Sequence, residues 1–146
     1  MSASYLLDVN VLIALMWPAH EAHRRVQEWF RLNSSEGWAT CPITQAGFVR
    51  IVSNPSFSSD AVQPQEAVNL LESNLKHAHH HFWPDDVSFL QAVRPSLERF
   101  NGHKQVTDCY LLGLALHRKG RLVSLDRGIL ELLADKRAGR ELVVIL

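Results

Sequence analysis

The chain has 146 residues, of which 47% are apolar and 21% charged, so it has room for one domain with a buried core and does not have the composition of a disordered protein. Lys and Arg total 15 and Asp and Glu total 15, which makes the formal net charge zero. A protein that attracts nucleic acid through a basic overall field is therefore excluded, and any such contact has to be local or assisted by a metal ion.

Short apolar runs that end at glycine, proline or aspartate predict strands, and helical periodicity predicts helices between them. In chain order we expect a strand at residues 4–7, a helix at 20–32, a strand at 38–41, helices at 43–54 and 64–75, a strand at 80–83, helices at 85–100 and 105–120, and strands at 121–125 and 141–146. Pro95 should kink or split its helix, and Gly120 is expected to cap the helix before it.

Strands that alternate with helices predict an α/β fold with a parallel sheet and right-handed crossovers. The apolar character of the strands fits burial on both faces of that sheet. No repeat or linker divides the chain, so we expect a single domain over residues 1–146.

Two cysteines, Cys41 and Cys109, lie beside apolar residues and are expected to be buried free thiols. No apolar run approaches the ~18 residues of a membrane span, and no signal peptide precedes Leu6. These features predict a cytoplasmic protein.

Three aspartates are expected to meet at one edge of the sheet. Asp8 ends the first strand and Asp126 ends the fourth, and ligands of open α/β sheets bind outside the carboxyl ends of the strands. Asp108 lies in the first turn of an apolar helix that can point at the same edge. Two simpler interpretations stay open, since Asp108 and Asp126 could each serve only a helix N-terminus. Gathered carboxylates repel one another, and oxygen-only ligands favour Mg²⁺ or Mn²⁺ over zinc.

Other polar clusters fit structural roles better than catalytic ones. The histidine-rich run at 77–81 is expected to be a solvated edge strand and not a zinc site. His20 and His23, one helical turn apart, are expected at the surface, and Asp85 and Asp86 are expected to cap the helix that follows them.

Four stretches carry a resemblance to a known family: LLDVNVLIAL (6–15), CPITQAGFVRIVSNP (41–55), QVTDCYLLGLAL (105–116) and RLVSLDRGI (121–129). In this order and spacing they resemble the PIN-domain family, and most of all the VapC-type ribonuclease toxins of bacterial toxin–antitoxin pairs. The resemblance implies a PIN-like three-layer sandwich whose central parallel sheet has about five short strands flanked by helices. It also implies a Mg²⁺-dependent endoribonuclease that leaves a 5′-phosphate and a 3′-hydroxyl.

The same resemblance implies a role for individual residues. Asp8, Asp108 and Asp126 match the catalytic, metal-binding carboxylates, and Asn10, Thr107 and Ser124 match polar positions beside them. Gln45 stands where the family usually has a glutamate, which removes one negative charge and weakens the case for a site with two metal ions.

Substrate and partners follow from the resemblance as well. Arg50, Lys104 and Arg127 could hold phosphates of the RNA, although ordinary surface charge explains them equally well. The family pairs with a VapB-type antitoxin and often forms homodimers, for which the apolar helix at 43–54 offers a face. Transfer, ribosomal and messenger RNA all stay open as targets, because selectivity of RNA enzymes often depends on loop shape.

Three alternative functions compete with this one. A phosphatase of the haloacid-dehalogenase type needs a second aspartate two residues after the first, where this chain has Asn10. A receiver domain needs an acidic pair near the amino terminus and a later lysine, and neither pattern is clear. A catalytically weak PIN-like module that binds RNA or a protein partner stays open because of Gln45.

Overall fold

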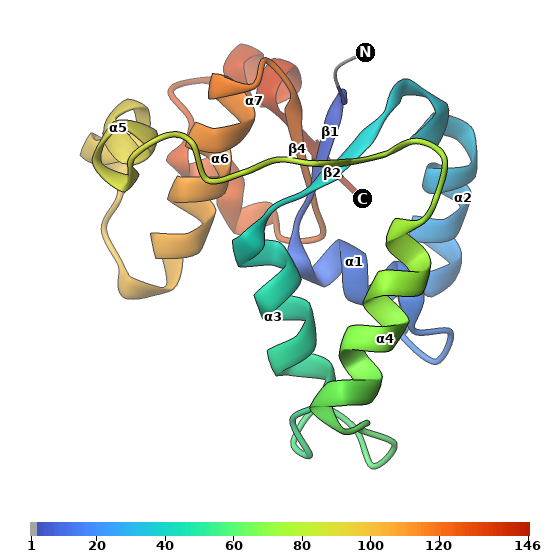
Figure 1. The fold of residues 1–146 in the computed structure, drawn as a ribbon. Coiled ribbons are helices and arrows are strands. Elements are labelled where there is room, and N and C mark those ends of the chain that lie inside the picture. The colour runs from blue at the N-terminus through green and yellow to red at the C-terminus, as the bar shows by residue number, and fades with distance from the viewer. Residues whose placement is uncertain (1–2) are drawn as a thin grey trace.

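Five parallel strands form one sheet in the computed structural model of the protein, which describes residues 3–146 (Figure 1). The strands are β1 (Tyr5–Leu7), β2 (Trp38–Thr40), β3 (His80–Phe82), β4 (Arg121–Ser124) and β5 (Val143–Ile145). They are ordered β3-β2-β1-β4-β5, and every neighbouring pair is parallel. The predicted α/β sandwich is confirmed, and β1 lies at its centre.

Helices cover both faces of this sheet (Figure 1). Within the described residues the α-helices are α1 (Val9–Met16), α2 (His23–Asn33), α3 (Pro42–Val52), α4 (Pro64–Leu75), α5 (Phe89–Val93), α6 (Val106–His117) and α7 (Lys136–Leu142). Short 3-10 helices span Ser34–Glu36, Arg94–Arg99, His103–Gln105 and Arg127–Leu132. The predicted helix at 64–75 has the observed bounds, and the bounds at 20–32, 43–54 and 105–120 differ by one to three residues at each end.

Alternate side chains of β1 enter two different hydrophobic clusters. Leu6 lies in one with residues of α5 and α6, and Tyr5 and Leu7 lie in the other with residues of α1, α2, α3 and α4. Both leucines are fully buried, so the strand is covered on both faces, as predicted. Truncating either leucine to alanine would cost about 2–5 kcal/mol of folding stability. The two leucines therefore anchor the strand that Asp8 directly follows.

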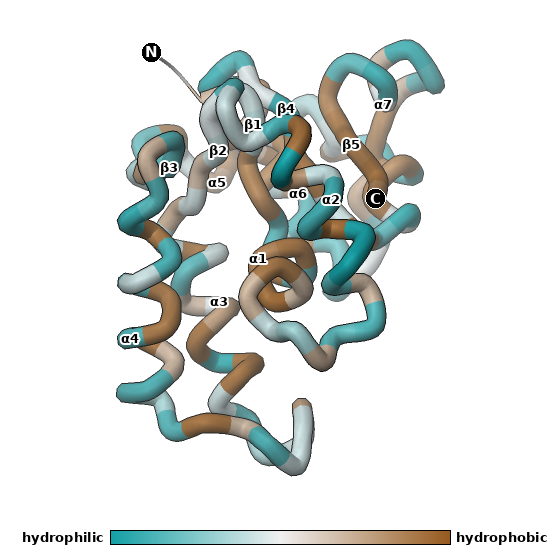
Figure 2. Tube along the Cα trace, turned by 90° about the vertical axis from the view of Figure 1, so that its right-hand side faces the viewer, coloured by the Kyte–Doolittle hydropathy of each residue, from teal (hydrophilic) through white to brown (hydrophobic). Residues whose placement is uncertain are grey.

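Two helices were not predicted from the sequence. Five of the eight residues of α1 are buried and none is exposed, and Figure 2 shows apolar colour along nearly all of α1, whereas α4 alternates between polar and apolar. A helix without a polar face lacks the periodicity that reveals a surface helix. The strand predicted over 141–146 begins only at Val143, because Glu141 and Leu142 end α7. Gly139 had indicated a break before the strand, but it lies inside that helix.

The predicted helix at 85–100 divides as expected near Pro95, into α5 and the 3-10 helix Arg94–Arg99. Its predicted caps are wrong. Ser88 caps α5 by accepting a hydrogen bond from the Gln91 amide at 3.2 Å. Asp85 instead accepts from the Tyr110 hydroxyl at 3.0 Å, and Asp86 pairs with Arg118 at 2.6 Å. Both acids therefore tie the segment before α5 to α6.

The end of α6 also differs from the prediction. Lys119, and not Gly120, takes the left-handed conformation, with φ of 58°. Gly120 is needed for space, because a Cβ on it would lie 2.8 Å from the Trp83 ring and 3.2 Å from the Ser4 carbonyl oxygen. The helix is thus terminated by a lysine, and the following glycine lets the chain pass under a tryptophan.

The histidines are more deeply involved in packing than predicted. β3 is an edge strand, as expected, but His80 is half-buried and packs against Trp38. His77 accepts a hydrogen bond from the Trp38 indole at 3.2 Å. His23 begins α2, so it is not one turn of the same helix away from His20, and its Nδ1 donates to the Ala14 carbonyl at 2.7 Å.

Cys41 and Cys109 are buried free thiols, as predicted. Among residues 3–146, no helix combines the length and the apolar character that crossing a membrane requires.

Gly113→Ala should destabilise the protein, because the added Cβ would lie 2.0 Å from the backbone oxygen of Ala92 and would force α5 away from α6. We expect a loss of about 1–3 kcal/mol or more in thermal or urea unfolding. Gly102→Ala is the matched control, since nothing lies within 4 Å of its Cβ, and it should stay within about 0.5 kcal/mol of the parent. Equal stability of both variants would contradict the close packing of α5 on α6.

Candidate active site

The three predicted aspartates all lie at the carboxyl edge of the sheet. Asp8 directly follows β1, and Asp126 lies two residues beyond β4, which is the neighbour of β1. Asp108 is in the first turn of α6. In Figure 1, β1 and β2 run into α1 and α3 at this same edge, and the first turn of α6 lies at that end of the molecule.

Asp8 is held at both carboxylate oxygens. Its Oδ1 accepts from the Val9 amide at 2.7 Å, and its Oδ2 accepts from the Ser124 hydroxyl at 2.7 Å. Only 6% of the residue is exposed. Asp8 is also the N-cap of α1, so its carboxylate has a structural role beside any chemical one. Two fixed hydrogen bonds leave this carboxylate little freedom to rotate.

Ser124 connects the first and fourth strand ends. Besides donating to Asp8, its hydroxyl oxygen accepts from the Asp126 amide at 3.0 Å and from Asn10 Nδ2 at 3.4 Å. A serine hydroxyl has one proton and two lone pairs, so all of its hydrogen-bonding capacity is used. The Asn10 carbonyl oxygen accepts from the Leu125 amide at 3.2 Å. Ser124 and Asn10 thus position the acids, in the places that the sequence predicted.

Mutual repulsion marks this edge. Burial, and then the nearby Asp8 and Asp126 charges, raise the pKa of Asp108 to about 7. Burial also raises the pKa of Asp8, which the hydrogen bonds from Ser124 and Val9 counteract and the Asp126 charge increases further. If Asp108 served only the helix N-terminus, the dipole would lower its pKa. The three carboxylates are therefore close enough to repel, and a cation among them would relieve that repulsion.

The donor set of this edge consists of carboxylate, hydroxyl and amide oxygens, which suits Mg²⁺ or Mn²⁺. As the side chains stand, no group of three His, Cys, Asp or Glu residues within 3–146 converges tightly enough to hold an ion. One oxygen of Asp126 is engaged by the Gly128 amide at 2.8 Å, which confirms the capping role weighed for it. The residues fit a hydrated ion whose remaining ligands are water or phosphate oxygens.

Gln45 lies beside this edge but bonds away from the aspartates. It is in the first turns of α3, two residues before Gly47, where a Cβ would lie 2.7 Å from the Val9 side chain. Its Nε2 donates to the Thr40 hydroxyl at 3.0 Å, and that hydroxyl is 2.8 Å from His80 Nε2. Sequence analysis missed Thr40 and His80, because nothing in the local pattern shows that neighbouring strands bring them to Gln45.

The remaining predicted residues are exposed. Thr107 and Lys104 lie just before Asp108, and Arg127 directly follows Asp126. Arg50 is in the last turn of α3, about 12 Å along the helix axis from its first residue. Their side chains make no hydrogen bond or ion pair within residues 3–146; Lys104 and Arg127 are near the acids in sequence, whereas Arg50 lies farther along α3.

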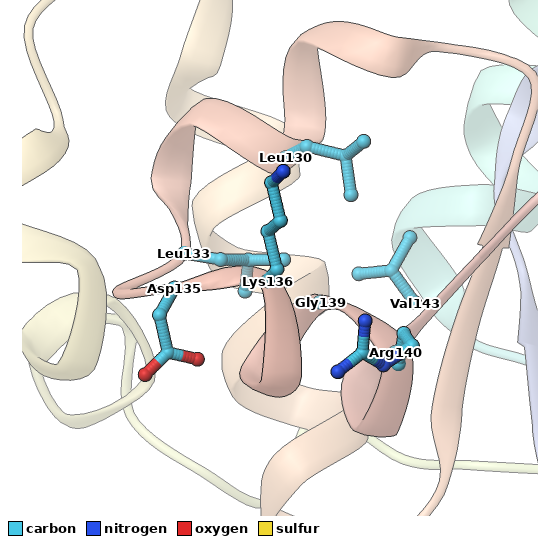
Figure 3. Close-up of a pocket in the computed structure, with 7 residues that line it drawn as sticks. All are labelled: Leu130, Leu133, Asp135, Lys136, Gly139, Arg140 and Val143. Atoms are coloured by element: carbon cyan, nitrogen blue, oxygen red, sulfur yellow. The ribbon is translucent and has the colours of Figure 1, made fainter.

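A hollow lies away from these residues, between the 3-10 helix Arg127–Leu132 and α7 (Figure 3). It encloses about 570 Å³ and is lined by Leu130, Leu133, Asp135, Lys136, Gly139, Arg140 and Val143. None of the three aspartates lines it. This hollow is therefore separate from the acidic edge.

Comparison with known proteins identifies the fold and its relatives. Residues 5–135 match the PIN domain family. The chain belongs to the PIN domain family. It is 47% identical over 124 residues to Ribonuclease VapC39 of Mycobacterium tuberculosis, covering 85% of this chain and 89% of that protein. It is also 42% identical over 142 residues to Ribonuclease VapC38 of the same species, covering 97% and 99%.

Two solved structures share the fold. VapBC2 from Rickettsia felis, bound to a DNA fragment from its promoter, matches with a TM-score of 0.62 at 15% identity, covering 97% of this chain and 98% of that one. PAE2754 from Pyrobaculum aerophilum matches with a TM-score of 0.62 at 18% identity, covering 97% and 83%. The family match over residues 5–135 and the VapC relatives confirm the predicted resemblance to the PIN-domain family and set aside the haloacid-dehalogenase alternative.

Asp108→Asn should stabilise the metal-free protein at high pH. Above about pH 4 the unfolded carboxyl has lost its proton, while the folded one keeps it up to about pH 7, so the stability of the parent falls as the pH rises through this window. The variant lacks this penalty, so its melting temperature should exceed that of the parent above pH 7 and approach it below pH 4.

Thermal unfolding with a chelator from about pH 4 to 8 measures the difference. Glu66→Gln is the control, because Glu66 is an exposed acid in the first turn of α4. A gain for Asp108→Asn that does not depend on pH would contradict the raised pKa.

Proposed function

We propose that this protein is a Mg²⁺-dependent endoribonuclease, with Mn²⁺ as a possible substitute, and that it acts as the toxin of a type II toxin–antitoxin pair. The observation that carries the proposal is the gathering of Asp8, Asp108 and Asp126 at one sheet edge, where burial, and then repulsion from the other two carboxylates, raise the pKa of Asp108 to about 7. Relatives named Ribonuclease VapC support the substrate class. The two buried free thiols fit a reducing cytoplasm.

The chain's residues divide the work by their surroundings. Asp8 and Asp108 would hold the ion, since Asp8 is fixed by two hydrogen bonds and Asp108 gains most from a neighbouring cation. When bound, Mg²⁺ polarises a phosphoryl oxygen and lowers the pKa of a bound water. Asp126 is exposed and would orient the attacking water from the solvent side.

Charged groups around the edge would hold the RNA. Lys104 and Arg127 flank the acids in sequence and are unpaired within residues 3–146, so they are free to contact phosphates on either side of the cleaved bond. Arg50 could contact RNA only farther along the strand. A neutral protein needs such local cations, because its overall field does not attract RNA.

Two protein partners belong to the proposal. A VapB-type antitoxin is supported by the VapC relatives and by the fold match to VapBC2, a complex that is named for both components. A homodimer is a further part of it, with the partly apolar α3 as one candidate face.

A second candidate is a PIN-domain module that binds RNA or a partner and cleaves weakly. The neutral Gln45 favours it, because the acidic edge has three carboxylates and not four. The cleavage experiment on Asp8 separates the two candidates.

Asp8→Asn should abolish Mg²⁺-dependent RNA cleavage and leave the fold intact. The amide keeps one carbonyl oxygen for the donors around it, and it removes a charge from a repulsive cluster. Gel analysis of RNA cleavage, together with circular dichroism, measures both effects. Asp60→Asn, at an exposed aspartate in the segment between α3 and α4, should cleave like the parent. Cleavage by Asp8→Asn at the parental rate would make the site assignment wrong.

Expression of the parent alone should arrest growth, and co-expression of the short gene beside it should restore growth. Asp8→Asn should be harmless in the same host but should still co-purify with the neighbouring product, because loss of one charge leaves the fold and its surfaces unchanged. Growth curves and affinity co-purification test this expectation. Harmless expression of the parent, with no neighbouring product bound, would remove the toxin proposal.

A further inference from the structure

A second hollow lies at the end of α6 that is remote from the acidic edge. It encloses about 520 Å³ where the end of α6 meets the edge strand β3 and Ala3. Arg118 directly follows α6 and Asp108 is in its first turn, so the two lie about 15 Å apart along the helix axis. The titratable side chains that line the hollow are His81, Asp86, His117, Arg118 and Lys119. None of the three aspartates of the acidic edge is among them, so the proposed chemistry does not account for this hollow.

Positive charge exceeds negative charge around the hollow. Asp86 is the carboxylate in its lining: Oδ2 accepts from Arg118 Nη2 at 2.6 Å, and Oδ1 lies 3.5 Å from His117 Nε2. Lys119 forms no ion pair within residues 3–146, so its charge is not neutralised. Arg118 Nε is buried, and it finds no acceptor in the described part of the chain. The hollow therefore offers an unpaired cation and an unused donor, and both suit an anion.

The backbone of Lys119 gives a further indication. Its φ of 58° lies in the left-handed region. Glycine is the residue that this conformation favours after a helix, so a lysine here costs stability. The dipole of α6 favours a cation at this end, but a neighbouring residue could supply that charge without strain. Because strained residues are retained where they serve a site, the left-handed turn points to a role for the Lys119 charge.

Phe82 adds an exposed aromatic ring to the same hollow. It ends β3, and 52% of the residue is exposed. Proteins that bind single-stranded nucleic acid combine cations that contact phosphates with aromatic side chains on which bases stack. The hollow has both components. Its chemistry fits one nucleotide unit, with the phosphate at Arg118 and Lys119 and the base on Phe82.

We propose that this hollow is a second RNA-binding site, which holds a nucleotide of a single-stranded segment away from the cleaved bond. The inference rests on the proposed RNA substrate, which the acidic edge would hold at the other end of α6. Such a site supplies the local cations that a chain without net charge needs. A free nucleotide shares this phosphate and base chemistry, but RNA engages both ends of the helix at once, and linked contacts bind more tightly than separate ones.

Binding of a fluorescein-labelled, unstructured oligouridine, measured by anisotropy in a chelator, tests the hollow without cleavage. Lys119→Gly should weaken binding about 3–10-fold and make the slope of log affinity against log salt shallower by about 0.7, because one phosphate contact is lost. Glycine suits the left-handed backbone, so this variant should melt at a temperature no lower than the parent. Lys136→Ala, which removes the same charge from the hollow beside α7, should bind like the parent.

The aromatic ring is tested in the same assay. Phe82→Leu should weaken RNA binding about 5-fold or more, because the base loses its stacking partner while an apolar side chain remains. Phe89→Leu is the matched control, since Phe89 is another exposed phenylalanine and lies outside the hollow. Uridine monophosphate at equal phosphate concentration, and polyglutamate at equal charge, should each displace the labelled RNA less than unlabelled oligouridine does.

Parental affinity and salt slope in Lys119→Gly, or an equal loss in Lys136→Ala, would overturn the inference. Uridine monophosphate that competes as well as oligouridine would assign the hollow to a free nucleotide, and polyglutamate that does so would assign it to an acidic protein. Either result would overturn the RNA assignment. With Mg²⁺ present, Lys119→Gly should raise KM for a long RNA and leave kcat unchanged. A parent that binds RNA through this hollow but never cleaves it would contradict the proposed function and leave this inference standing.

Discussion

Negative charge gathered in a partly desolvated place is the constraint on which the rest of this structure depends. Asp8 is almost completely buried where β1 and its neighbour β4 end. Asp108 and Asp126 add negative charge beside it. The fold holds these groups in place through the Ser124 hydroxyl, which touches the first and fourth strand ends at once. A cation would relieve the repulsion at such an edge, and this supports the proposal that it is a site and not merely a set of helix caps.

The neutral overall charge and the acidic edge both limit how the protein can bind nucleic acid. A chain without a basic field has no general affinity for nucleic acid, so binding has to come from an ion and a few local cations. The hollow beside α7 is lined by none of the three aspartates. Gln45 adds no charge beside this edge. Its amide donates to the Thr40 hydroxyl, which in turn contacts His80 of β3.

Much of the fold and of the acidic edge could be predicted because the signals are local. Most strands are short apolar runs beside a breaker, and Asp8 and Asp126 directly follow such runs. The helix α1 was not predicted because it has no exposed polar face, and α7 was not predicted because Gly139 suggested a break. The prediction that Asp85 and Asp86 cap a helix is wrong. Their partners are Tyr110 of α6 and Arg118 at its end, which are distant from them in the sequence. Thr40 and His80 belong to this class of contacts as well.

The central claim is that the gathered carboxylates are held ready for a cation, and proton release on ion binding tests it most directly. Calorimetry of Mn²⁺ binding in buffers of different ionisation enthalpy counts the protons released. Because the pKa of Asp108 is raised to about 7, the account predicts release of about one proton per ion near pH 6 and almost none near pH 8.5. Binding of Mn²⁺ with no proton release near pH 6 would contradict it.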